Sequence, residues 1–321
     1  MSDLLYPKPS NVHSGHLEVS DGHELYYEIS GNPDGFPVLY LHGGPGAGFS
    51  GAEHRYFDPD YYQVIIFDQR GAGRSLPYAE TKNNSPEHLV ADIEVLRKFL
   101  RLSNWSIAGG SWGSCLALLY ATKYPNLVNR LMLRGIFYGD IKGAKHIIEK
   151  DGAATIQPEY FEQYAHAPFV PESARHNLTQ MYHDVFEYGD EKTQIDAAMR
   201  FDIWDTSIAY VQPNKKAIQN IRRNPGRSLA LTKLFFHFTV NHYAKRDYKK
   251  DIFKKIETLK DIPIDIIHGE CDWICPVANA YELKQKCPHA NMNIVLGAGH
   301  TMADPEIRDS VIQTLNRWVE E

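Results

Sequence analysis

Trp105-Ser-Ile-Ala-Gly-Gly-Ser-Trp-Gly113 is a short apolar segment that runs into glycines around one serine. The apolar part predicts a buried strand, and Leu116 to Tyr124, which Pro125 ends, predicts the helix that follows. Residues 109–113 thus match G-x-S-x-G between a strand and a helix, the context of a nucleophile elbow. Neighbours without side chains permit so sharp a turn, and we expect the Oγ of Ser111 to project above the sheet.

The segments around this elbow predict a mostly parallel sheet. Further apolar runs are typical of strands that are buried on both faces. They lie at residues 37–42, 64–67 and 131–134. Residues 17–29 alternate about Asp21-Gly22 and predict a hairpin. Ser85 is the expected N-cap of a helix with apolar residues that recur to Leu100. The strand that begins at Trp105, the helix from Leu116 to Tyr124 and the strand at 131–134 form a βαβ unit in this order.

The pattern changes between residues 140 and 255, where aromatic and acidic residues recur at helical spacing. We expect this segment to be an inserted helical cap domain, and residues 1–139 and 256–321 to form the core. Strand patterns return at 262–267 and 293–296, and Ile307 to Trp318 predicts a closing helix. The predicted fold is therefore α/β, with a mostly parallel central sheet, flanking helices and an inserted cap.

Composition excludes several classes of protein. The chain has 321 residues, 43% of them hydrophobic and 12% aromatic, which is typical of a globular protein. Its net charge of −6 gives no overall basic surface for nucleic acid, and no apolar run is long enough to span a bilayer. Residues 1–10 lack the apolar core of a signal peptide. Four cysteines are too few for a disulfide framework, and we expect a reduced cytoplasmic protein. The oligomeric state stays open.

A serine nucleophile needs a base, and the expected order along the chain is serine, acid, histidine. His300, in Gly297-Ala-Gly-His300, follows the last strand and is the candidate base. Asp272 follows the strand that ends at Gly269 and is the favoured acid; Glu270 is the competing one. Asp304 follows the histidine too closely to orient it.

The oxyanion of a tetrahedral intermediate needs two backbone N–H donors. Trp112, directly after the candidate nucleophile, supplies one. The other is assigned to Gly44 in His42-Gly-Gly-Pro-Gly46, a glycine-rich loop after an early strand. A phosphate-binding loop is the alternative, but G-x4-G-K-[ST] is absent. Cys271 and Cys275 form C-x3-C without a second ligand pair, so a zinc site there is weakly supported.

Together these motifs resemble the proline iminopeptidases, which are α/β-hydrolase-fold prolyl aminopeptidases with a helical cap. The resemblance covers almost all of the predicted core, including the loops around Asp272 and His300. It rests on four motifs in order: His42-Gly-Gly-Pro-Gly46, Asp68-Gln-Arg-Gly-Ala-Gly-Arg-Ser75, Gly109-Gly-Ser-Trp-Gly113 and Leu133-Arg-Gly-Ile-Phe137.

The resemblance also implies how a substrate binds. Family members recognise the free N-terminal amine with cap glutamates, one of which follows a tryptophan. Here Trp204-Asp205 stands in that place, and Phe235 stands where a second glutamate is expected. We therefore expect Trp204, Asp205, Phe235 and Phe137 to line the substrate site, with Asp202 and Glu187 as further candidate acids.

The predicted function is a serine hydrolase that releases N-terminal proline, or another small residue, from peptides. No metal or organic cofactor is expected. One alternative is an esterase or amidase for small acyl groups that needs no free amine. Another is a non-catalytic binding protein, which the filled serine, acid and histidine positions disfavour. Dehalogenase chemistry would require a carboxylate in place of Ser111.

Overall fold

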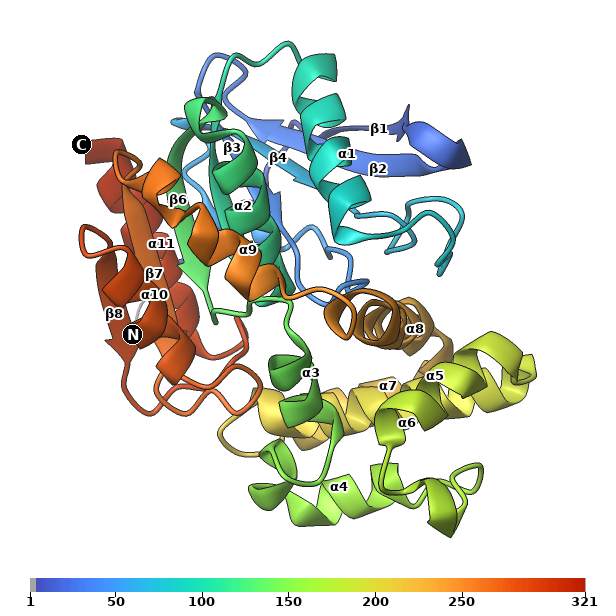
Figure 1. Ribbon diagram of the computed structural model, residues 1–321. Helices are drawn as coiled ribbons and strands as arrows, with labels where there is room; N and C mark the ends of the chain where they lie inside the picture. Colours follow the sequence, from blue (N-terminus) through green and yellow to red (C-terminus); the bar gives the residue numbers. More distant parts are fainter. Residues whose placement is uncertain (1–3, 321) are drawn as a thin grey trace.

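The computed structural model describes residues 4–320, and its strands form one eight-stranded sheet (Figure 1). The strand order is β1-β2-β4-β3-β5-β6-β7-β8. β2 pairs antiparallel with β1 and β4, and all other neighbouring strands are parallel, as predicted. The strands are β1 (His13–Glu18), β2 (Glu24–Gly31), β3 (Phe36–Leu41), β4 (Tyr62–Phe67), β5 (Trp105–Gly110), β6 (Val128–Arg134), β7 (Ile264–Gly269) and β8 (Asn291–Val295).

The core helices begin and end close to the predicted residues. Ser85 caps α1, since its Oγ accepts a hydrogen bond from the N–H of His88 (3.3 Å). α2 begins directly after Ser111, earlier than the apolar pattern indicated, and α10 was not predicted. The helices packed around the sheet are α1 (Pro86–Phe99), α2 (Trp112–Lys123), α9 (Tyr248–Lys254), α10 (Ala278–Lys286) and α11 (Pro305–Glu320).

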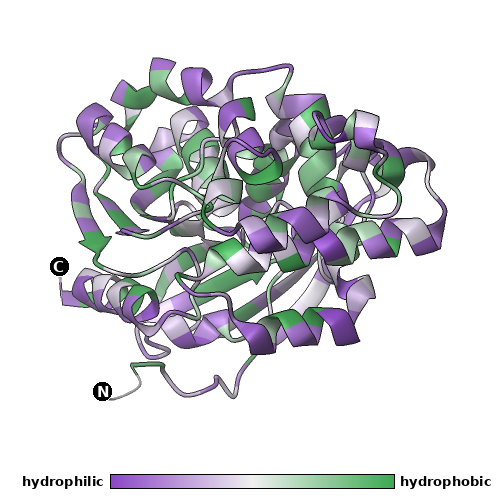
Figure 2. Ribbon diagram, turned by 90° about the horizontal axis from the view of Figure 1, so that it is seen from below, coloured by the Kyte–Doolittle hydropathy of each residue, from purple (hydrophilic) through white to green (hydrophobic). Residues whose placement is uncertain are grey.

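Helices cover both faces of the sheet, and each face has its own hydrophobic core. Successive side chains of a strand point to opposite faces, so neighbouring residues belong to different cores. Leu39 and Ile65 belong to the core that includes α1 and α2. Val38 and Ile66 belong to a second core, which α11 covers. Hydrophilic and hydrophobic residues are mixed along the outer helices (Figure 2), as expected for amphipathic helices that pack on a sheet. No helix within residues 4–320 is long and apolar enough to cross a membrane.

A helical insert separates β6 from β7. Most of it lies beyond one end of the sheet, below the core in Figure 1. Its helices are α3 (Ile141–Ile148), α4 (Pro158–Ala165), α5 (Leu178–Tyr188), α6 (Glu191–Ala209), α7 (Lys215–Arg223) and α8 (Leu229–Phe238). The sequence-based division also places α9 in the cap, whereas this helix packs against α2 of the core. The domain boundaries at residues 140 and 255 stay a prediction.

Candidate active site

Ser111 occupies a sharp turn between β5 and α2. Its φ is 57° and its ψ −126°, a conformation that costs a residue with a side chain on the order of 1–3 kcal/mol. Its N–H donates a hydrogen bond to the carbonyl of Arg134 (2.8 Å), which ties the turn to β6. The adjacent Gly113 must lack a side chain, because a Cβ there would lie 2.2 Å from the carbonyl oxygen of Leu41. The local geometry is that of the predicted elbow.

Asp272 and His300 meet at the ends of β7 and β8. The Nδ1 of His300 lies 2.7 Å from the Oδ2 of Asp272, while the other carboxylate oxygen accepts hydrogen bonds from the N–H groups of Ile274 (3.1 Å) and Cys275 (2.8 Å). Burial disfavours the charged carboxylate, but the facing His300 and these hydrogen bonds together hold the pKa of Asp272 below its usual value. The acid is therefore ionised at neutral pH and fixes His300 with Nδ1 protonated.

The competing acid Glu270, and Asp304 as well, have other partners. Glu270 is exposed, and its carboxylate accepts a hydrogen bond from the N–H of Gly297 (3.0 Å). Asp304 accepts one from the N–H of Gly299 (2.9 Å). Both acids thus hold the loop that carries His300, whereas Asp272 contacts its imidazole.

His268 supports the acid loop, a contact that the sequence analysis did not anticipate. It is completely buried at the end of β7. Its Nδ1 accepts a hydrogen bond from the N–H of Ile136 (3.1 Å), and its Nε2–H donates to the carbonyl of Cys275 (2.7 Å). Burial lowers the pKa of His268, so it stays neutral in this arrangement. The sequence shows only a histidine at a strand end, which does not reveal this support.

The glycine-rich loop after β3 lies beside Ser111. A Cβ on Gly43 would be 3.7 Å from the Oγ of Ser111, and Gly43 and Gly44 both line the cavity above it. Gly44 has a φ of 114°, which favours glycine. Trp112 is the first residue of α2, so its N–H has no acceptor within the helix. Both candidate oxyanion donors therefore belong to segments next to the serine.

One cavity, of about 230 Å³, joins the core residues to the cap. This is below the roughly 300–1,000 Å³ of sites for drug-sized ligands, so it suits a small group. Ser111, His300 and Gly44 of the core line it together with the predicted cap residues Asp205 and Phe235. Its remaining lining includes Phe137, Ile147, Phe201, Leu231, Ile274, Cys275 and Met302.

Asp205 is the acidic residue among the cavity's lining residues. It lies on α6 and is half-buried. Burial raises its pKa to about 7, with further contributions from the negative charges of Asp202 and Asp272. A cationic group in the cavity would reverse this effect by favouring the carboxylate. Asp205 is thus placed to pair with a cation.

The other candidate residues lie in different places. Phe137 lines the cavity, but Trp204 is buried in the cap core, where its indole N–H donates to the carbonyl of Ile147 (2.8 Å). Asp202 accepts a hydrogen bond from the hydroxyl of Ser228 (2.5 Å). Glu187 is exposed on α5 and is not among the cavity's lining residues. The structure therefore brings Asp205, Phe137 and Phe235 to the cavity and leaves Trp204 and Glu187 away from it.

Arg134 and Cys275 also line the cavity, although neither was among the predicted catalytic or substrate-binding residues. The guanidinium of Arg134 donates a hydrogen bond to the carbonyl of His300 and so holds the histidine loop. Its position in Leu133-Arg-Gly-Ile-Phe137 is the signal that could have identified it. Burial raises the pKa of Cys275 well above its usual value, so its thiol is protonated and a poor nucleophile.

The strand order and the elbow are those of the α/β-hydrolase fold, and a family model described as "alpha/beta hydrolase fold" matches residues 37–306. Solved structures agree at the level of the fold. A haloalkane dehalogenase loop variant from Bradyrhizobium elkanii has a TM-score of 0.66 at 15% identity and covers 97% of each chain. A proline iminopeptidase-related protein from Thermus thermophilus has a TM-score of 0.63 at 21% identity and covers 97% of this chain and 99% of its own.

Sequence relatives identify the family. A proline iminopeptidase of Xylella fastidiosa (strain Temecula1) is 37% identical over 315 residues, which is 98% of this chain and 99% of the relative. The proline iminopeptidase of Neisseria gonorrhoeae is 38% identical over 312 residues, 97% of each chain. The chain belongs to the proline iminopeptidase family, which confirms the resemblance seen in its motifs.

Proposed function

We propose that this protein is a serine aminopeptidase that releases N-terminal proline, or another small residue, from short peptides. The observation that carries the proposal is the shared cavity. Ser111, His300 and Asp205 all line it, and Asp272 lies 2.7 Å behind the imidazole. A nucleophile, a base and an anionic site for the substrate's amine thus line one small cavity.

In the proposed reaction, the Oγ of Ser111 attacks the carbonyl carbon of the N-terminal residue. The Nε2 of His300 takes the hydroxyl proton, because its Nδ1–H is engaged by Asp272. When the tetrahedral intermediate collapses, the C–N bond breaks and His300 gives that proton to the leaving amine. Water, activated by the same imidazole, then hydrolyses the acyl-enzyme and regenerates the serine.

The backbone N–H groups of Gly44 and Trp112 are the proposed donors to the oxyanion. Donors fixed in a tight loop and at a helix N-terminus need no reorganisation as negative charge develops. The partial positive charge at the N-terminus of α2 acts in the same direction. This mechanism uses groups of the chain itself together with water.

Amine recognition is proposed for the cap, which we assign to residues 140–255. A desolvated substrate ammonium needs an anionic partner, and Asp205 supplies one. Phe235, Phe137 and other apolar side chains of the cavity would enclose the proline ring. We also propose a cytoplasmic location, supported by four cysteines that are all unpaired.

One feature favours a second candidate, an esterase or amidase for small neutral acyl groups. Phe235 stands where the family resemblance implies a second acid, and the cavity is lined mainly by apolar side chains. With a single carboxylate whose pKa is about 7, the preference for a cation is weaker than with two ionised acids.

The proposed function is tested with three substrates: proline-naphthylamide, its N-acetylated form and a matched small ester. We expect efficient cleavage of proline-naphthylamide and at least about tenfold lower kcat/KM for the acetylated form. A tenfold loss corresponds to about 1.4 kcal/mol, the free energy expected for one lost ion pair. Ser111→Ala should lower the activity by about 10⁴-fold or more without changing the fold. Equal rates with and without the acetyl group would favour the esterase.

A further inference from the structure

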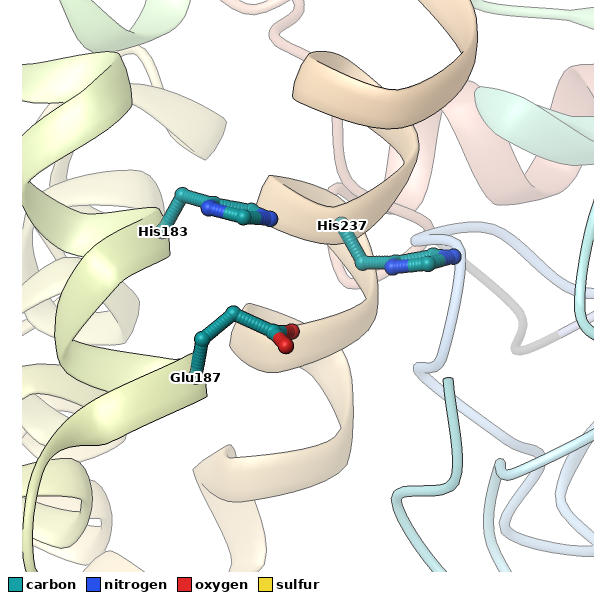
Figure 3. A group of neighbouring side chains, drawn as sticks. All are labelled: His183, Glu187 and His237. Atoms are coloured by element: carbon teal, nitrogen blue, oxygen red, sulfur yellow. The ribbon is translucent and has the colours of Figure 1, made fainter. Parts of the chain in front are cut away.

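Outside the catalytic cavity, three metal-binding side chains converge in the cap. His183 and Glu187 lie four residues apart on α5, so they share one face of that helix, and His237 comes from the neighbouring α8 (Figure 3). One ligand atom from each of the three residues lies within 4.8 Å of the other two. The active-site mechanism uses none of these residues.

The lone pairs of both histidines point to the same place. The side-chain nitrogen of Asn241 lies 3.2 Å from the Nε2 of His183 and 3.2 Å from the Nδ1 of His237. Because an amide NH₂ only donates hydrogen bonds, both ring nitrogens are acceptors there. Two unprotonated nitrogens directed at one point are what a metal ion requires.

A second contact fixes the tautomer of His237. Its Nε2–H donates to the carbonyl of Asn84 (3.2 Å), which leaves Nδ1 unprotonated. Histidines that bind metals commonly have their other ring N–H held by a backbone carbonyl in this way. The imidazole is therefore oriented before any ion arrives.

Access also suits a cation. Glu187 is exposed, while both histidines are partly buried. Within residues 4–320, the structure gives the Glu187 carboxylate no hydrogen bond or ion pair. The cluster thus presents one carboxylate and two ring nitrogens at a position that solvent can reach.

We propose that His183, Glu187 and His237 bind a divalent transition-metal ion of the zinc class. Two imidazoles and a carboxylate are a known zinc ligand set, with the fourth position left to water. Zinc–ligand distances of about 2.0–2.2 Å require small side-chain rotations that bring the three ligands closer, and the ion takes the place of the Asn241 amide.

Such an ion would join α5 to α8. Leu231 and Phe235 of α8 line the catalytic cavity, and the Asn84 carbonyl that accepts from His237 belongs to the core. The site would therefore stabilise the cap at the helix that borders the substrate. An ion that binds the folded chain and not the unfolded one raises Tm with its concentration.

Calorimetric titration of the full chain with zinc chloride tests the site. We expect one tight site, and a loss of affinity of at least about tenfold in His183→Ala, His237→Ala and Glu187→Gln. His166→Ala is the matched control, because Glu162 on α4 and His166, the residue directly after that helix, form an equally spaced pair (2.8 Å) without a third ligand in the described part of the chain. This control should bind zinc as the wild type does.

A second cluster must be separated from this one, since ligand atoms of Asp272, Cys275 and His300 also lie within 4.8 Å of one another. Zinc affinity that disappears in His300→Ala but persists in His183→Ala would overturn the proposal. Unchanged affinity in Glu187→Gln and His183→Ala would overturn it as well. Thermal unfolding in the presence of EDTA shows which variants are folded without metal. If the alanine variants are not folded, Glu187→Gln provides the test, because this change is exposed and isosteric.

Discussion

Asp272 is the residue on which the proposed catalytic geometry depends most. It is buried, it contacts His300, and two backbone N–H groups hold its second oxygen. Asp272→Asn should lower kcat by about 10⁴-fold, because an amide in this place stabilises the wrong tautomer of the imidazole. Steady-state kinetics of the purified variant measures this loss.

Glu270→Gln is the matched control, since Glu270 is exposed and, within residues 4–320, its carboxylate accepts a hydrogen bond only from the loop N–H of Gly297. It should keep nearly all activity. A larger loss in Glu270→Gln than in Asp272→Asn would mean that the acid is Glu270.

Asp205 gives the proposed enzyme a pH-dependent affinity. Burial, and then the charges of Asp202 and Asp272, raise its pKa to about 7. Below that pH the acid is neutral and cannot pair with an ammonium group. KM for proline-naphthylamide should therefore rise as pH falls through about 7, while KM for a neutral ester stays constant.

Asp202→Asn provides an internal check on this pH effect. It removes the like charge that contributes more to the raised pKa of Asp205, so the change in KM should move to lower pH. A KM profile that is the same for both substrates would exclude Asp205 as the group responsible.

At the scale of elements, the elbow depends on the close approach of α2 to β3. A Cβ on Gly113 would lie 2.2 Å from the carbonyl oxygen of Leu41, which belongs to a strand and cannot move away freely. Gly113→Ala should lower the free energy of unfolding by about 1–3 kcal/mol, the usual range for overpacking. Urea unfolding should show a lower midpoint with an unchanged m-value.

Gly226→Ala is the control for this effect, because a Cβ on Gly226 meets no atom within 4 Å. It should change stability by less than about 0.5 kcal/mol. Equal destabilisation by both changes would show that the loss comes from glycine replacement in general rather than from the contact with β3.

The elements of the core were predictable because each has a local signal. Glycines and acids end the apolar runs at β5 and β7, and Ser85 caps α1, so the catalytic candidates could be placed at strand ends. α10 was missed because its apolar positions are few: within it only Ala280 and Leu283 are buried. Its place is set by packing against β7 and β8.

At the scale of the whole molecule, the limit of sequence reasoning lies in the cap. Residues of the cap reach the site through the orientation of whole helices, which no local pattern encodes. On α6, Asp205 faces the cavity while the adjacent Trp204 packs into the cap core, and the sequence could not separate the two. The contacts of Arg134 and His268 likewise depend on distant loops.

Core and cap pack through aromatic residues next to the elbow. Trp112, which follows Ser111, packs against Phe238 of α8 with ring centroids 5.4 Å apart and against Tyr243 at 5.8 Å. Its indole N–H also donates to the side chain of Gln69 (2.8 Å). The neighbour of the proposed nucleophile therefore helps to hold the cap over the cavity, and the proposed substrate recognition is a joint property of both parts.

The most direct test of this joint recognition is the selectivity of Asp205→Asn. The quantity to measure is kcat/KM for proline-naphthylamide divided by kcat/KM for a neutral small ester, in the wild type and in the variant at pH 8. We predict that the ratio falls at least about tenfold, through a higher KM for the amine substrate, while ester hydrolysis hardly changes. Equal losses on both substrates would contradict the account and leave Asp205 as a residue that only stabilises the cap.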